Sequence, residues 1–142
     1  MWGNVIFRNL TLGPGEAYKG GMGLKVYGYQ NCSTCQKALK FLESKKIKFE
    51  NLPIVDQPPS VSELKKMLGF LKAEGGTFKN LFNTSGVMYR EMNVSEQIKA
   101  GMTEAEAIQL LSKNGKLIKR PFAITTLAGT VGFKEEVWKK LF

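Results

Sequence analysis

The two cysteines of the chain, Cys32 and Cys35, stand two residues apart between a segment that predicts a strand and a segment that predicts a helix. Residues 24–29 form a short β-prone run that follows a glycine cluster. Apolar side chains recur at helical spacing over 33–46. The free N–H groups and the positive dipole end of a helix start stabilise a thiolate. The spacing therefore predicts a redox-active pair at the first turn of a helix.

The position of each cysteine suggests a separate role. Cys32 falls at or just before the first helical turn, where a thiolate nucleophile is favoured. Cys35 lies one turn further in, where it can attack a mixed disulfide and resolve it. Two unrelated buried cysteines are the alternative interpretation. A structural zinc site needs four ligands, and the sequence has no histidine and no second cysteine pair. We therefore expect no metal.

Three polar residues flank the nucleophile: Asn31, Ser33 and Thr34. Their amide and hydroxyl groups can donate hydrogen bonds to the Cys32 sulfur or to a bound oxyanion, as substrate-binding groups do. The same residue types also serve as ordinary N-caps. The sequence leaves both interpretations open.

Composition indicates one ordinary globular domain. The chain has 142 residues, of which 43% are hydrophobic and 23% charged. No apolar run approaches the roughly 20 residues needed to span a bilayer, and residues 1–22 make a poor signal peptide. We therefore expect a cytoplasmic, monomeric protein without a membrane segment. Residues 1–22 are rich in glycine and predict a disordered extension before a domain over 23–142, with Met22 as an alternative start.

The net charge of +9 comes mainly from lysine, with three arginines in the whole chain. A solvated basic surface is the simplest explanation. An anionic substrate, glutathione or an acidic protein partner are functional alternatives. The sequence contains no nucleic-acid-binding motif, and we expect no direct contact with nucleic acid.

The order of predicted elements is that of an α/β fold: a thioredoxin-like mixed sheet flanked by helices, with a helical insertion. Capping boxes at Ser60 and Thr103 predict the starts of two helices in the insertion. A further short turn is expected near residues 78–82. Strands are predicted at 24–29, 47–52, 118–124 and 130–133, the last an edge strand reached through a hairpin at Ala128-Gly129, and other helices at 33–46, 94–100 and 134–141.

Three motifs stand out together in the sequence: Cys32-x-x-Cys35, Asn83-Thr84 and Arg120-Pro121. Together they resemble the arsenate reductase-related (ArsC/Spx-like) family, over essentially all of residues 24–142. This family includes glutaredoxin-dependent arsenate reductases and Spx-type redox regulators of RNA polymerase.

The resemblance implies a role for several residues. Cys32 takes the position of the catalytic cysteine, and glutathione or a glutaredoxin or thioredoxin is the expected co-reductant, with no bound cofactor. Asn83 and Arg120 fall on anion-binding arginine positions of the reductases, and a further one aligns with Lys134. The Arg120-Pro121 bond is expected to be cis and to face the cysteines, which makes Pro121 part of the substrate site.

Two functions follow from the resemblance. The first is an oxidoreductase that uses Cys32, Cys35 and Arg120. The second is a Spx-type regulator that contacts the RNA polymerase α subunit, in which a disulfide changes affinity. The reductases carry more arginines, and the Spx type carries an arginine where this chain has Gln36.

Overall fold

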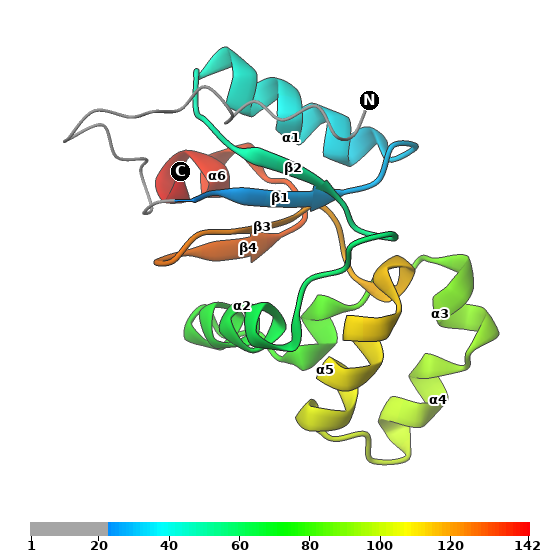
Figure 1. The fold of residues 1–142 in the computed structure, drawn as a ribbon. Helices are drawn as coiled ribbons and strands as arrows, with labels where there is room; N and C mark the ends of the chain where they lie inside the picture. Colours follow the sequence, from blue (N-terminus) through cyan, green and yellow to red (C-terminus); the bar gives the residue numbers. More distant parts are fainter. Residues whose placement is uncertain (1–22) are drawn as a thin grey trace.

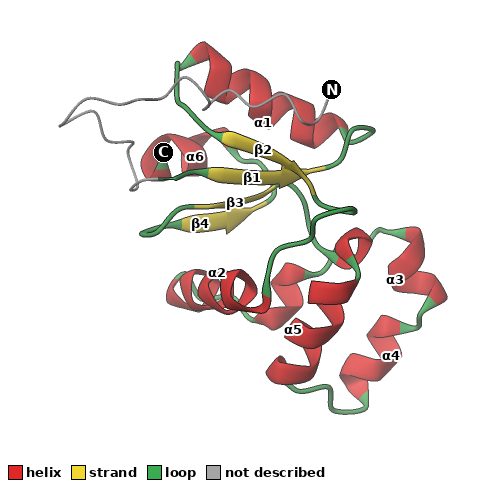
Figure 2. Ribbon diagram, in the orientation of Figure 1, coloured by secondary structure: helices red, strands yellow, loops and turns green. Residues whose placement is uncertain are grey.

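A computed structural model describes residues 23–142, and the extension predicted over 1–22 lies outside the described residues. A four-stranded sheet stands at the centre, with helices on both faces (Figures 1 and 2). The described elements follow in the order β1 (Lys25–Gly28), α1 (Ser33–Ser44), β2 (Glu50–Pro53), α2 (Val61–Ala73), η2 (Phe78–Leu81), α3 (Val87–Glu91), α4 (Val94–Lys99), α5 (Glu104–Lys113), η3 (Gly115–Leu117), β3 (Phe122–Ile124), β4 (Gly129–Val131) and α6 (Glu135–Leu141).

The sheet is mixed, with the strand order β2-β1-β3-β4. β1 pairs in parallel with β2 and antiparallel with β3, and β3 pairs antiparallel with β4. β4 is therefore an edge strand, as predicted. The arrangement confirms the predicted α/β, thioredoxin-like fold with a helical block inserted between β2 and β3.

Two apolar layers cover the two faces of the sheet. Because successive side chains of a strand point to opposite faces, Val26 packs on one side and Tyr27 on the other. The Val26 side holds α1 and α6, where Trp138 is fully buried. The Tyr27 side holds α2 and α5 (Figure 1). Packing on both faces holds β1 in place, and the loop that leads to Cys32 begins at the C-terminal end of this strand.

Local signals determined where α2 and α5 begin. The hydroxyls of Ser60 and Thr103 accept hydrogen bonds from the N–H groups of Glu63 and Glu106, and each glutamate side chain bonds back to the N-cap N–H. Both predicted capping boxes are confirmed. Each one satisfies backbone donors that the helix itself leaves unpaired.

The strand predicted over 47–52 begins later than predicted, at Glu50. Lys46 adopts a left-handed conformation (φ 56°) after α1, and the Ile47 N–H donates to the Leu42 carbonyl. This C-terminal motif uses the backbone groups that the start of a strand needs. The helix end therefore displaces the strand.

The strand predicted over 118–124 is also shorter than predicted, since β3 begins at Phe122. Ile118 pairs instead with Phe82 in an isolated antiparallel bridge. Pro121 lacks an N–H and cannot continue a ladder on both sides. The residues before Pro121 therefore do not extend β3, and Ile118 pairs with a different segment of the chain.

At the other edge, β4 spans residues 129–131 rather than 130–133. Gly132 ends it with φ 78°, a left-handed conformation that favours glycine. The hairpin turn lies two residues earlier than predicted, at 126–127, because the Thr125 N–H donates to the Ala128 carbonyl and Gly129 already belongs to the strand. Helix α3 was not predicted, and its N-cap, Gly86, supplies no side-chain hydrogen bond. None of the helices in residues 23–142 has both the length and the apolar character needed to cross a membrane.

Candidate functional site

Cys32 is the N-cap of α1, with an extended backbone conformation. Its Sγ accepts a hydrogen bond from the Cys35 backbone N–H at 3.3 Å, in the place where an oxygen acceptor usually caps a helix. Its own N–H donates to the Tyr29 carbonyl at 3.1 Å. The first turn of α1 carries no acidic residue. The positive end of the helix dipole therefore remains free to stabilise a thiolate at this sulfur.

Cys35 lies in a different environment, one turn into α1, with no exposed surface. Burial is the main cause that raises the pKa of its thiol to about 12, and a side-chain hydrogen bond with Cys32 adds to it. A backbone hydrogen bond from Tyr29 and the charge of Arg120 act in the opposite direction. Cys35 is therefore a protonated thiol at neutral pH, held behind the half-buried Cys32.

Arg120 comes from the segment before β3, and its peptide bond to Pro121 is cis, as the resemblance implied. Its guanidinium carbon lies 4.9 Å from the centroid of the Tyr29 ring, a cation–π arrangement that holds the planar group in place. Within the described residues its Nη1 is buried and has no hydrogen-bond partner. An unpaired buried donor is costly. This nitrogen is therefore a buried cationic donor that the described residues leave unpaired.

A cavity of about 400 Å³ joins Cys32 and Arg120. Lys119 and Lys134 line it as well, so it is bordered by three cationic side chains, and none of the described residues that line it is acidic. The remaining polar lining comes from the first turn of α1 and from the loop before α3: Thr34, Asn83, Thr84 and Ser85. The cavity is thus suited to an anion placed next to a reactive sulfur.

Long-range backbone pairing brings the Asn83 loop to the cavity. The Asn83 N–H donates to the Leu117 carbonyl and the Lys119 N–H to the Leu81 carbonyl, both at 2.8 Å. Gly86 closes the loop, and a Cβ there would lie 2.8 Å from Asn83 Nδ2. The loop can turn this tightly around Asn83 because residue 86 has no side chain.

The structure brings only some of the predicted site residues together. Cys32, Thr34, Asn83 and Arg120 line the cavity, and Cys35 lies buried behind Cys32. Three predicted substrate-binding residues do not line it, of which Asn31 and Ser33 are exposed and Pro121 is buried.

Sequence reasoning missed Tyr29 as the support of Arg120 and Lys119 as a cavity cation. The available signal for Lys119 was its position directly before Arg120, a residue of the Arg120-Pro121 motif. Tyr29 gave no such signal, because a ring–guanidinium contact across 91 positions cannot be inferred from spacing. Within residues 23–142 no cluster of three potential metal-ligating side chains occurs.

The fold and the site together define a thioredoxin-like protein with a cysteine as the N-cap of its first helix. The chain belongs to the ArsC family, whose model matches residues 27–141.

The chain matches 80% or more of the length of each of three similar proteins. It is 41% identical over 119 residues to the uncharacterized protein YusI of Bacillus subtilis, covering 84% of this chain and 98% of the relative. The crystal structure of an ArsC-family-related protein from Bacteroides fragilis is 45% identical, with a TM-score of 0.77, covering 85% of this chain and 98% of that one. The global transcriptional regulator Spx of Bacillus subtilis is 27% identical over 111 residues, covering 78% and 80% of the two chains.

Proposed function

We propose that the chain is a thiol–disulfide oxidoreductase in which Cys32 is the nucleophile and Cys35 the resolving thiol. One observation carries the proposal: Cys32, whose sulfur caps α1, and Arg120, whose buried Nη1 has no hydrogen-bond partner in the described residues, line the same cavity. A thiolate near the Arg120 guanidinium suits a substrate that carries both an electrophilic sulfur and an anionic group.

The reaction proceeds by two displacements on sulfur. The Cys32 thiolate attacks a substrate disulfide, forms a mixed disulfide with one half and releases the other half as a thiolate. Cys35 then loses its proton and attacks the Cys32 sulfur, which releases the second half as a thiolate that takes up a proton. The substrate gains two electrons, and the enzyme is left with a Cys32–Cys35 disulfide.

The environment of Cys35 changes during this cycle. Two causes that raise the pKa of its thiol are its hydrogen bond with Cys32 and the negative charge of that residue. Both disappear once Cys32 is bound in a mixed disulfide, whereas the opposing charge of Arg120 remains. Burial still holds the pKa up, but resolution becomes easier at the stage where it is needed.

Two molecules of glutathione, or a glutaredoxin or thioredoxin, would restore the reduced pair and supply the two electrons. Lys119, Arg120 and Lys134 support glutathione, because its two carboxylates match cations at the cavity. The reducing cytoplasm, where we expect the protein to act, provides these thiols.

Arsenate is a second substrate to test, and we expect it to be reduced slowly. Among the cations that line the cavity only Arg120 has the planar fork that binds an oxyanion through two parallel bonds. Lysines act as point charges and do not reproduce this geometry.

The test is an assay in which the protein reduces a glutathione mixed disulfide in the presence of excess glutathione. The measured quantity is the rate at which oxidised glutathione is released. Cys32→Ser should abolish turnover, and Cys35→Ser should accumulate the mixed disulfide on Cys32, visible by mass spectrometry. Arg120→Gln should lower kcat/KM by about ten- to a hundredfold, since a charge-assisted hydrogen bond contributes roughly 1.5–3 kcal/mol. Lys45→Gln, the same charge change at the other end of α1, is the matched control. Turnover by Cys32→Ser at the wild-type rate would refute the proposal.

A Spx-type regulator is the second candidate, favoured by the matched extent of the chain and the Spx relatives. The partner to test is the RNA polymerase α subunit, by pull-down with the reduced and the oxidised chain. Binding in one redox state only would support a regulator. Failure to bind in either state would remove this candidate and leave the oxidoreductase proposal untouched.

A further inference from the structure

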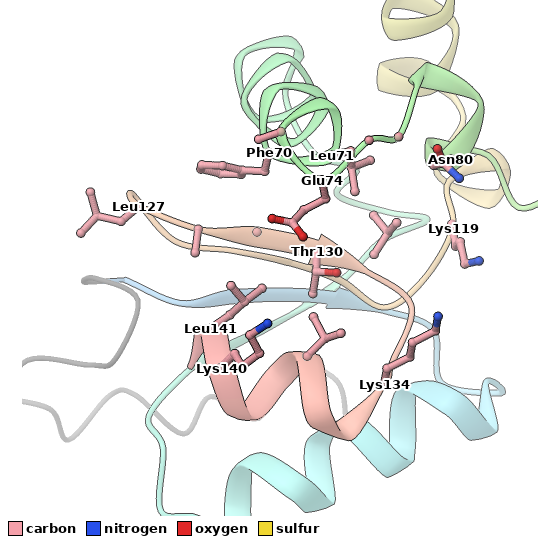
Figure 3. A pocket seen from close by; sticks show the side chains of 17 residues that line it. Phe70, Leu71, Glu74, Asn80, Lys119, Leu127, Thr130, Lys134, Lys140 and Leu141 are labelled. Atoms are coloured by element: carbon pink, nitrogen blue, oxygen red, sulfur yellow. The ribbon is translucent and has the colours of Figure 1, made fainter.

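A second, larger hollow of about 630 Å³ runs along the edge strand β4, between α2 and α6. Figure 3 shows Thr130 of β4 between two walls, with Phe70 and Leu71 on the α2 side and Lys140 and Leu141 on the α6 side. We call this hollow the β4 groove. Its floor is the uncovered edge of the sheet.

The outer edge of β4 offers backbone hydrogen-bonding groups. The Thr125 N–H donates to Ala128 and the Gly132 N–H to Pro121, so the alternation of an antiparallel ladder makes Thr130 the residue that pairs with β3. The N–H and C=O groups of Gly129 and Val131 consequently point away from β3. Outside the ladder with β3, neither residue makes a backbone hydrogen bond to the described part of the chain. These groups form a template for one more strand.

The two walls of the β4 groove differ in chemistry. The α2 wall is apolar at Phe70 and Leu71 and carries a carboxylate at Glu74. The α6 wall presents Lys134 and Lys140. An added strand would therefore meet an apolar and acidic wall on one face and a cationic wall on the other.

The ends of the groove differ as well. The hairpin end carries Leu127, a large apolar residue that is nevertheless 73% exposed. The opposite end carries Lys119 and Lys134, which also line the Cys32 cavity. The groove and the cavity thus adjoin at the Val131 end of β4.

We propose that the β4 groove binds an extended segment of a partner protein in which apolar and acidic residues alternate. The segment pairs with Gly129 and Val131 as a fifth strand, directs its apolar side chains to Phe70 and Leu71, and directs its carboxylates to Lys134 and Lys140. Strand addition supplies affinity through the backbone, and the two walls select the sequence.

A second copy of this chain fits the groove poorly. The chain carries a net charge of +9, and pairing β4 with β4 would bring the lysines of the two grooves towards each other. The lysines lie on the walls, whereas Gly129, Thr130 and Val131 on the strand itself are uncharged. The edge is thus short but not blocked by its own side chains.

The probe is an acetylated and amidated peptide that alternates valine and glutamate, titrated into the full-length ¹⁵N-labelled protein. We expect saturable chemical-shift changes centred on the amides of Gly129 and Val131. Two matched peptides test the chemistry: one with lysine in place of glutamate, and one with N-methyl groups on alternate residues. Both should bind at least about tenfold more weakly, through loss of charge complementarity and of strand pairing respectively.

Two protein variants test the site from the other side. Val131→Pro removes an outward-pointing N–H and leaves the Thr130 ladder pair in place, so it should abolish peptide binding. Lys140→Glu should weaken binding by roughly three- to tenfold, whereas Lys45→Glu should leave it unchanged. Lys140→Glu tests the proposal even where Val131→Pro fails to fold. Cys32→Ser should bind like the wild type, because the groove requires no reactive thiol.

Several results would overturn the proposal. Equal binding of the lysine peptide, or shift changes centred away from β4, would remove the assigned chemistry. Shift changes at Gly129 and Val131 that grow with protein concentration, without peptide, would identify a second copy as the occupant. If sodium sulfate caused the same chemical-shift changes as the peptide, the site would be only a cluster of lysines that binds anions. No binding at saturating peptide would leave β4 a protected edge.

Discussion

Cys32 and Cys35 belong to the same helical turn, and we predict that alkylation distinguishes them sharply. Iodoacetamide reacts with the thiolate, so its rate follows the fraction of each thiol that is ionised. Cys32 is half-buried and lines a cavity, whereas Cys35 has no exposed surface. Burial, followed by the hydrogen bond with Cys32, raises the pKa of Cys35 to about 12.

The size of the difference follows from that pKa. At about pH 7.5 a thiol with a pKa of about 12 is ionised in roughly three molecules in a hundred thousand. A thiol with the free-cysteine value of about 8.5 is ionised in roughly one molecule in ten. The raised pKa thus lowers the thiolate fraction of Cys35 roughly three thousandfold relative to a free cysteine, before the difference in access is added. Native, reduced protein should therefore label at Cys32 alone.

The assay is timed alkylation, quenching and peptide mass spectrometry of the native protein. Cys35→Ser isolates the rate of Cys32, and Cys32→Ser isolates the rate of Cys35. In the second variant the rate should rise, because the hydrogen bond and charge of Cys32 are gone, yet remain low, because burial is the larger cause. Labelling in denaturant is the control, in which the two rates should converge.

Labelling of Cys35 within about tenfold of the rate of Cys32 would refute this reasoning. It would mean that the helix opens locally or that Cys35 is not desolvated, and the assignment of nucleophile and resolving thiol would lose its physical basis. Faster labelling of Cys35 would reverse the two roles.

Three further predictions concern stability. From about pH 8 to 9.5 the reduced protein should melt at progressively lower temperature. The reason is that the unfolded chain releases the Cys35 proton near pH 8.5, whereas the folded chain holds it up to about pH 12. Cys35→Ala should flatten this dependence, and an unchanged slope in that variant would contradict the prediction. Burial opposes ionisation of Glu63, but hydrogen bonds led by that from the Ser60 N–H lower the pKa of its carboxyl overall, so Glu63→Gln should cost about 1–2 kcal/mol in urea unfolding near neutral pH. That cost should shrink as pH falls below about 4, and a constant cost would exclude the charge as its origin. Gly115→Ala should cost about 3 kcal/mol or more, because its Cβ would meet the Ile54 carbonyl, whereas Gly69→Ala in α2, where a Cβ meets nothing within 4 Å, should stabilise the fold by about 0.5–1 kcal/mol.

Local physics made part of the fold predictable. The capping boxes at Ser60 and Thr103 set the starts of α2 and α5, because a cap is satisfied within four residues. The position of Cys32 at the start of α1 was predictable for the same reason. The strand starts at 47 and 118 were wrong, because the decisive hydrogen bonds of those residues go to a helix end and to a distant segment.

The candidate site also has a part that local sequence predicts and a part that depends on long-range contacts. The sequence alone determined that a thiol would cap a helix with a second thiol one turn behind it, because both lie within one turn of chain. Only the tertiary structure decided what faces them. Arg120, its Tyr29 support and the Asn83 loop meet at Cys32 through the cis bond, a cation–π contact and the Phe82–Ile118 bridge. Pairing across dozens of residues is selected by the packing of the whole chain, and no local pattern encodes it.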